Sequence, residues 1–221
     1  MTHEELLSTI SFFEDAPKEV IDRIGEHVRT VELNRGDVLF READEPTDLY
    51  VVVSGRVVIA RDHHGVDNRE SVMALMERGD LFGELALLDG GRRSATARAV
   101  EPAVVAKVPY GPVRDELRAN PEMLWGVARM LVSRLRAMDE ALADSVFLDV
   151  IGRTAKRLLD LSNGQDEFTL PVTQEELAGM VGASRERVNK SISSFIRLGW
   201  IEQHDRHYKI LQRAKLEQRA S

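Results

Sequence analysis

The spacing of apolar residues changes along the chain, and each change predicts a different kind of structure. Residues 1–28 carry apolar side chains at helical spacing, and Pro17 marks the start of a second short helix. From Thr30 to Tyr110 the sequence is rich in valine and runs in short alternating or apolar bursts separated by glycines. Short strands at such regular spacing predict a β-sandwich or barrel.

After Pro121 the spacing becomes that of one long helix. Apolar positions alternate in steps of three and four residues at Ala128, Leu131, Leu135, Met138 and Leu142, and continue less regularly at Leu124 and Ser145. A seam this narrow, on a helix of about 20 residues and roughly 30 Å, requires a partner helix. The simplest partner is a second copy in a parallel two-fold dimer, and the alternative is packing on the chain's own barrel.

The last third of the chain predicts a winged helix-turn-helix. An amphipathic helix over "VFLDVIGRTAKRLLDLS" comes first. Thr173 and Glu176 form a capping box at the start of a second helix, and residues 182–184 form a tight turn. A third helix places Val188, Ile192 and Phe195 on one face, and "GWIEQHDRHYKIL" closes as a two-stranded wing.

The outer face of that third helix carries chemistry suited to a DNA major groove. Arg185 with Asn189, and Glu186 with Lys190, are two pairs spaced four residues apart. Arginine and lysine can bind guanine edges, and glutamate can accept from the cytosine amine. Three arginines around the rim, at positions 187, 197 and 206, would meet phosphates. The alternative is an ordinary helix salt bridge between Glu186 and Lys190.

Charge distribution supports a DNA-binding C-terminal part. The net charge is −7, but residues 1–149 hold 18 Lys and Arg against 28 Asp and Glu, a balance of −10. Residues 150–221 hold 12 against 9, a balance of +3. An acidic body with a basic C-terminal domain is expected when one domain meets a polyanion.

Composition excludes several classes of function. Because the chain has no cysteine, disulfides, zinc fingers and thiolate iron–sulfur clusters are excluded. No nucleophile–base pair is visible, so no catalytic residue and no metal site is expected. The histidines are read as solvated loop residues: His63 and His64 beside Asp62 in a hairpin loop, His204 and His207 in the wing. No signal or membrane-spanning segment is found, which predicts a cytoplasmic protein with no membrane partner.

One stretch remains after this survey, "GELALLDGGRRSAT" from Gly83 to Thr96. It combines an apolar, hairpin-like pattern with a glycine pair and ends on two adjacent arginines. Such a stretch is either a surface turn with solvated charges or a pocket for a small anion.

The order of barrel, long helix and winged helix-turn-helix resembles the Crp/Fnr family of bacterial transcription regulators. "FGELALLDGGRRSAT" is similar to the family's phosphate-binding cassette, and "VGASRERVNK" is similar to its recognition helix. The resemblance implies an α+β fold with a β-roll cyclic-nucleotide-binding domain at 1–115, a long dimerisation helix at 116–145 and a DNA-binding domain at 146–221. It also implies a homodimer that binds double-stranded DNA and meets RNA polymerase.

Carried over residue by residue, the resemblance assigns roles within the cassette. Glu84 would accept from the ribose 2′-hydroxyl, Arg93 would pair with the cyclic phosphate, and Ser94 would donate to it. Gly83 and Leu85 would offer close backbone approach. Arg93 would therefore point inward and Arg92 would lie at the rim. The family's haem and iron–sulfur sensors use cysteines that this chain lacks, so the implied effector is a cyclic nucleotide alone.

The base-recognition positions depart from the family pattern. Cyclic-AMP-responsive members present a threonine and then a serine where this chain has Met138 and Asp139. Met138 can only pack against the base, and Asp139 could accept from adenine or guanine. Cyclic AMP is the first choice, cyclic GMP is an alternative, and a regulator that acts without nucleotide is a third reading.

At the DNA end, Arg185, Glu186 and Lys190 match the three base-reading positions of the family. They imply inverted TGTGA-like half-sites about one helical turn apart. Three further residues match positions that contact the DNA backbone: Thr173, Gln174 and Ser184. A cyclic-nucleotide-binding module without DNA binding is the alternative from another class, and these base-reading residues argue against it.

Overall fold

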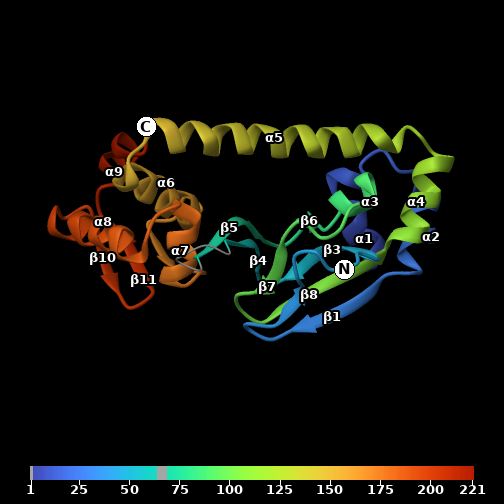
Figure 1. Ribbon diagram of the computed structural model, residues 1–221, viewed down its shortest axis with the longest axis horizontal. Helices are drawn as coiled ribbons and strands as arrows, with labels where there is room; N and C mark the ends of the chain where they lie inside the picture. Colours follow the sequence, from blue (N-terminus) through green and yellow to red (C-terminus); the bar gives the residue numbers. More distant parts are fainter. Residues whose placement is uncertain (1, 64–68) are drawn as a thin grey trace. The chain divides into compact units, whose positions relative to one another are not determined.

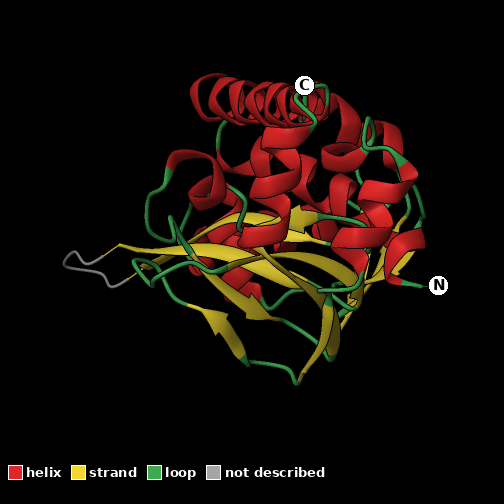
Figure 2. Ribbon diagram, turned by 90° about the vertical axis from the view of Figure 1, so that its right-hand side faces the viewer, coloured by secondary structure: helices red, strands yellow, loops and turns green. Residues whose placement is uncertain are grey.

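The structure is a computed structural model that describes residues 2–63 and 69–221. Its elements form two compact units. The first comprises Met1–Arg61 and Ala74–Ala137, and the second comprises Asp62–Met73 and Met138–Ser221. Helices and strands both contribute throughout (Figures 1 and 2), in agreement with the predicted α+β class.

The strands predicted between Thr30 and Tyr110 form a β-roll. Two four-stranded antiparallel sheets have the orders β1-β8-β3-β6 and β2-β7-β4-β5 in the described residues. The strands are β1 (Arg29–Leu33), β2 (Val38–Phe40), β3 (Asp48–Ser54), β4 (Val57–His63), β5 (Arg69–Met76), β6 (Leu81–Phe82), β7 (Thr96–Ala99) and β8 (Ala103–Pro109). In the β3–β8 pair, Leu49 lies opposite Val108 and Val51 opposite Ala106, and all four side chains are buried.

Short helices cover the roll and complete its core. Three precede β1, as predicted: α1 (His3–Leu7), the 3-10 helix η1 (Ser11–Phe13) and α2 (Lys18–Gly25). The apolar run after Glu84 is a helix, α3 (Leu85–Asp89), and not the hairpin-like segment expected from the sequence. Its end at Gly90 explains the difference, because that glycine adopts a φ of 73° and stops the helix after five residues. A further helix, α4 (Tyr110–Ala119), follows β8 directly.

The long helix is α5 (Met123–Phe147), with 25 residues. It begins at Met123 and not at residue 116, because Asn120 leaves the helical conformation and Pro121 cannot continue it. Met123, Val127 and Met130 are buried in the core of the first unit. The side chains of the predicted seam lie on another face and are exposed, Leu135 to 57% and Leu142 to 64%.

The second unit confirms the predicted winged helix-turn-helix. Its elements are α6 (Val150–Ser162), β9 (Glu167–Thr169), α7 (Gln174–Val181), α8 (Arg185–Arg197), β10 (Ile201–His204), β11 (His207–Ile210) and α9 (Arg213–Arg219). Thr173 and Glu176 form the expected capping box, with both reciprocal hydrogen bonds present. Gly182 turns the chain between α7 and α8 with a φ of 67°. The wing strands pair with β9 in the order β10-β11-β9.

The C-terminal helix α9, which the sequence did not predict, packs on α6. Leu216 is fully buried, and the backbone oxygen of Arg219 lies so close to Gly152 that a Cβ there would stand 2.9 Å from it. Arg219 also donates to the carboxylate of Asp149, which caps α6 by accepting from the Gly152 N–H. The end of the chain therefore supports the start of α6.

The histidines contribute no metal site in the parts of the chain that the structure describes. His204 and His207 are exposed at the ends of the two wing strands, as expected. Asp62 and His63 were expected in a loop but belong to β4, because the strand extends further than the sequence pattern indicated. His64 lies outside the described residues.

Candidate nucleotide-binding and DNA-binding sites

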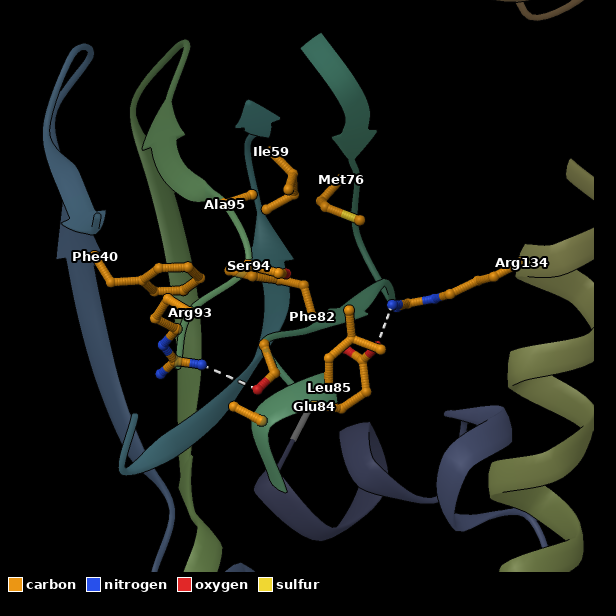
Figure 3. A pocket seen from close by; sticks show the side chains of 12 residues that line it. Phe40, Ile59, Met76, Phe82, Glu84, Leu85, Arg93, Ser94, Ala95 and Arg134 are labelled. Carbon is orange, nitrogen blue, oxygen red and sulfur yellow. Dashed lines mark hydrogen bonds and ion pairs between the residues drawn. The ribbon is translucent and has the colours of Figure 1, made fainter. Parts of the chain in front are cut away.

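Both ends of the stretch from Gly83 to Thr96 line a cavity of about 70 Å³ in the β-roll (Figure 3). The cavity is lined by Phe40, Ile59, Met76, Phe82, Gly83, Glu84, Leu85, Ala86, Arg93, Ser94, Ala95 and Arg134. Most of the lining is apolar, and its charged groups are one carboxylate and two guanidinium groups. The cavity therefore offers both signs of charge within an environment of low polarity.

Arg93 is a buried cation with no acidic partner among the described residues. Its side chain is 5% exposed. Nη1 donates to the Gly83 carbonyl and to the Tyr110 hydroxyl, both at 3.0 Å, and Nη2 donates to the Asp48 carbonyl at 2.7 Å. The guanidinium carbon lies 4.1 Å from the centre of the Phe40 ring. These bonds use both nitrogens of the fork, while the buried Nε–H has no hydrogen-bond partner.

Glu84 is the buried carboxylate of the cavity, with no exposed surface. One of its oxygens, Oε1, accepts from Arg134, and the other, Oε2, has no hydrogen-bond partner. Burial raises the pKa of the Glu84 carboxyl, and the Arg134 guanidinium acts in the opposite direction. The free oxygen is thus an acceptor without a donor, at the position where the sequence predicts a ribose hydroxyl.

Arg134 is the site residue that the sequence analysis missed. It extends from α5 into the cavity and also donates to the Leu81 carbonyl (Figure 3). It lies four residues before Met138, and residues at this spacing share a helix face. A charged residue beside the apolar seam, one turn before a nominated base-binding position, is the signal that could have revealed it.

Glu84→Gln should stabilise the ligand-free protein at neutral pH. A raised pKa means that the folded protein binds more protons than the unfolded chain, so this carboxyl lowers stability as pH rises through that window. We expect Glu84→Gln to gain on the order of 1 kcal/mol in free energy of unfolding at pH 7. The gain should shrink as pH falls toward the ordinary carboxyl pKa. Urea unfolding between pH 4 and pH 7 measures both.

The exposed Glu45 provides the control for that measurement, because Glu45→Gln removes a carboxylate that is 80% exposed. Its stability difference from wild type should stay near zero at every pH. A Glu84→Gln protein that is less stable than wild type at pH 7 would contradict the argument.

The remaining cassette residues divide between wall and rim. Gly83 has a φ of 80°, and a Cβ there would lie 2.6 Å from Nη1 of Arg93, so only glycine fits beside the guanidinium. Leu85 and Ser94 line the cavity and are exposed. Arg92 is exposed and pairs with Glu45 at 2.9 Å. The two adjacent arginines therefore point in the inward and outward directions expected from the sequence.

The nominated base-recognition residues do not line the cavity. Met138 and Asp139 are both exposed on α5. Met138 shares the helix face of Arg134, one turn further along, whereas Asp139 lies beside the exposed seam.

The predicted DNA-reading residues lie together on one face of α8. Ser184 caps the helix by accepting from the Arg187 N–H. Val188, Ile192 and Phe195 are buried on the inner face. The outer face presents Arg185, Glu186, Arg187, Asn189 and Lys190, all exposed. Glu186 and Lys190 form no ion pair in the described structure, which argues against the reading that they are a helix salt bridge.

A groove of about 330 Å³ lies beside this face, between the start of α7 and the wing. Its lining includes Thr173, Gln174, Arg185, Gln203 and Arg206. The Gln174 amide donates to the Tyr208 hydroxyl at 2.8 Å, while its Oε1 atom is buried without a partner. Arg206 donates to the Leu170 carbonyl at 2.8 Å. This rim arginine therefore also connects the wing to the segment that follows β9. Arg197, by contrast, is exposed at the end of α8.

Within its described residues, the chain has no helix that is long and apolar enough to cross a membrane.

Comparisons with known proteins match both units. The profile of the cyclic nucleotide-binding domain matches residues 30–120, and that of the Crp-like helix-turn-helix domain matches residues 152–219. A "CRP-like cAMP-activated global transcriptional regulator" from Mycobacterium tuberculosis is 33% identical over 98% of this chain and 99% of its own length.

Two solved structures from Thermus thermophilus are similar in fold. The catabolite activator protein of that organism is 30% identical, with 95% of this chain and 98% of the other covered and a TM-score of 0.53. The transcriptional regulator TTHA1359, of the CRP/FNR family, is 26% identical, with 87% and 98% covered and a TM-score of 0.72.

Proposed function

Since this chain belongs to the Crp family of cyclic-nucleotide-binding transcription regulators, we propose that cyclic AMP is its effector and that it binds inverted TGTGA-like half-sites as a homodimer. The family is one of regulators and not of enzymes. The observation that carries the nucleotide part of the proposal is the buried Arg93 guanidinium, which has no acidic partner among the described residues and whose Nε–H has no hydrogen-bond acceptor.

The phosphate and ribose contacts follow from the free hydrogen-bonding groups in the cavity. A cyclic phosphodiester carries one negative charge, and a guanidinium can meet two of its oxygens at once. Arg93 offers its unpartnered Nε–H for this, and Ser94 supplies a hydroxyl at the same wall. The ribose 2′-hydroxyl then donates to the free Oε2 of Glu84, while Arg134 retains Oε1.

The choice of cyclic AMP rests on a relative of this chain. The Mycobacterium tuberculosis relative is named as cAMP-activated. In our proposal Met138 packs against the base and Asp139 accepts from its exocyclic amine, which both adenine and guanine carry. Cyclic GMP is therefore the competing effector, and a regulator that acts without nucleotide is the other alternative.

Dimerisation is proposed to occur along α5. Leu131, Leu135, Met138 and Leu142 form an exposed apolar stripe at heptad spacing, and the buried side of the helix already contacts its own unit. An exposed stripe of this kind is stabilised when a second helix covers it. The two-fold axis of such a dimer would match the symmetry of an inverted repeat.

Nucleotide binding and DNA binding are proposed to communicate through α5. The ion pair between Glu84 and Arg134 joins the cavity to this helix. A nucleotide that engages Glu84 changes the surroundings of Arg134 and so can favour one arrangement of α5 over another. A thousandfold gain in DNA affinity would require about 4 kcal/mol of coupling between the two sites.

On DNA, Arg185, Glu186 and Lys190 are proposed to read bases in the major groove from the exposed face of α8. Thr173, Gln174, Ser184 and Arg187 are proposed to contact phosphates, with Asn189 beside them. RNA polymerase is the proposed further partner, and 1–115, 116–145 and 146–221 are the proposed functional divisions of the chain.

The test is fluorescence anisotropy with a labelled duplex that carries two inverted TGTGA half-sites. We expect cyclic AMP to raise operator affinity by at least tenfold over the nucleotide-free protein, and cyclic GMP to do so less. Arg185→Ala should lose operator binding because a base contact is worth about 1–3 kcal/mol per subunit, while calorimetric titration shows unchanged nucleotide affinity.

Each alternative predicts a different result. Equal operator affinity with and without either nucleotide would overturn gating by these ligands. A protein that binds nucleotide but no operator would indicate the regulatory module without DNA binding. Loss of both activities in Arg185→Ala would assign that residue a role in folding.

A further inference from the structure

Tyr110 contacts the proposed phosphate ligand residue without lining the cavity. It is the first residue of α4 and is 5% exposed. Its hydroxyl accepts from Nη1 of Arg93 at 3.0 Å and donates to the Gly83 carbonyl. The same carbonyl accepts from Arg93 at 3.0 Å. These three groups form a closed set of hydrogen bonds at one end of the guanidinium.

This arrangement determines which N–H groups of Arg93 stay available. Both donors on Nη1 are used, one by Gly83 and one by Tyr110, and Nη2 donates to Asp48. The donor that remains without a partner among the described residues is on Nε. If the Tyr110 hydroxyl were absent, a donor on Nη1 would be free and the guanidinium could turn to satisfy it.

The aromatic rings around Arg93 restrict its other motions. The guanidinium carbon lies 4.1 Å from the Phe40 ring centre and 5.8 Å from the ring centre of Tyr110 itself. Stacking limits tilting of the guanidinium plane, and the hydrogen bonds limit rotation within it. Backbone support comes from the Tyr110 N–H, which donates to the Thr47 carbonyl at 2.9 Å.

We propose that Tyr110 is a positioning residue for the phosphate of the effector: its hydroxyl holds the Arg93 guanidinium so that the edge with the free Nε–H faces the phosphate oxygens. This inference rests on the proposed cyclic-nucleotide function. Tyr110 acts through Arg93 and makes no contact with the nucleotide.

The protonation state of the phenol agrees with this role. Burial raises the pKa of Tyr110, an effect that the nearby Arg93 charge opposes. The hydroxyl therefore keeps its proton at neutral pH and can donate to Gly83 while it accepts from Arg93.

Tyr110→Phe tests the proposal, because it removes one oxygen and keeps the ring. Calorimetric titration of the full-length protein with cyclic AMP should give an affinity about tenfold lower than wild type, since a hydrogen bond to a charged group is lost. The same titration with 2′-deoxy cyclic AMP measures the ribose preference, because this analogue lacks the 2′-hydroxyl that is proposed to donate a hydrogen bond to Glu84. That preference, the ratio of the two affinities, should stay within twofold of the wild-type ratio.

Tyr208→Phe is the matched control. It removes the hydroxyl of another buried tyrosine, one that contacts Gln174 in the second unit, and should leave both nucleotide affinities unchanged. A Tyr110→Phe affinity within twofold of wild type would overturn the positioning role. A ribose preference that falls along with the affinity would overturn it too, because the hydroxyl would then support the cavity backbone in general. Failure of the wild-type protein to bind either nucleotide refutes the proposed function itself.

Discussion

Arg93→Met should lose cyclic-nucleotide binding by at least 100-fold while the protein remains folded. The substitution removes a buried cation whose free Nε–H is proposed to pair with the phosphate. Truncating one partner of a buried, hydrogen-bonded charge pair costs about 2–5 kcal/mol of binding free energy. Methionine keeps most of the apolar stem and can pack against the Phe40 ring, so the cavity wall is preserved.

Thermal unfolding separates this binding defect from a folding defect. At a nucleotide concentration 100-fold above its Kd, wild type should gain about 2.7 kcal/mol, or roughly 5–10 °C in Tm. Arg93→Met should show no such shift, and its nucleotide-free Tm should stay close to that of wild type, because the loss of a buried charge without an acidic partner offsets the loss of its three hydrogen bonds. Arg92→Met, next to it but exposed, should keep the full shift. An Arg93→Met protein that retains wild-type affinity would refute the phosphate assignment.

Leu135→Asp should convert the proposed dimer to a monomer. Leu135 lies in the middle of the α5 stripe and is 57% exposed in the single chain. Burying two symmetry-related carboxylates against each other is unfavourable. Light scattering should give the mass of one chain, and affinity for a duplex with two half-sites should fall by about 10²–10³, because the second half-site no longer binds as part of the same complex.

The control keeps the charge and changes only the face of the helix. Ser133→Asp places a carboxylate on an exposed position of α5 away from the stripe. It should remain dimeric with normal operator affinity. If the Leu135→Asp protein remains a dimer, the α5 stripe is not the dimer interface.

The fold was predictable where local pattern determines structure. Strand alternation before Tyr110, the capping box at Thr173 and the glycine turn at Gly182 all follow from the sequence and are confirmed. α3 was not predicted because the helix is only five residues long, too short to show helical periodicity. α9 was missed because its amphipathic pattern rests on Leu216, whose burial depends on the distant α6.

The candidate site shows a similar limit. Glu84 and Arg93 stand in one recognisable segment, and the sequence places them correctly in the roll. Arg134 lies 50 residues after its partner Glu84, and Tyr110 lies 17 residues after its partner Arg93. Only tertiary structure brings these pairs together. Their roles depend on which oxygen or N–H group is already occupied, and sequence patterns do not contain that information.

The contact between α9 and the start of α6 limits how the chain can be shortened. A DNA-binding fragment that stops after the wing, at residue 211, would lack α9. The surface of α6 against which α9 packs would then be exposed to water, and Asp149 would lose its contact with Arg219. Leu216 is fully buried, so its removal alone costs about 2–5 kcal/mol.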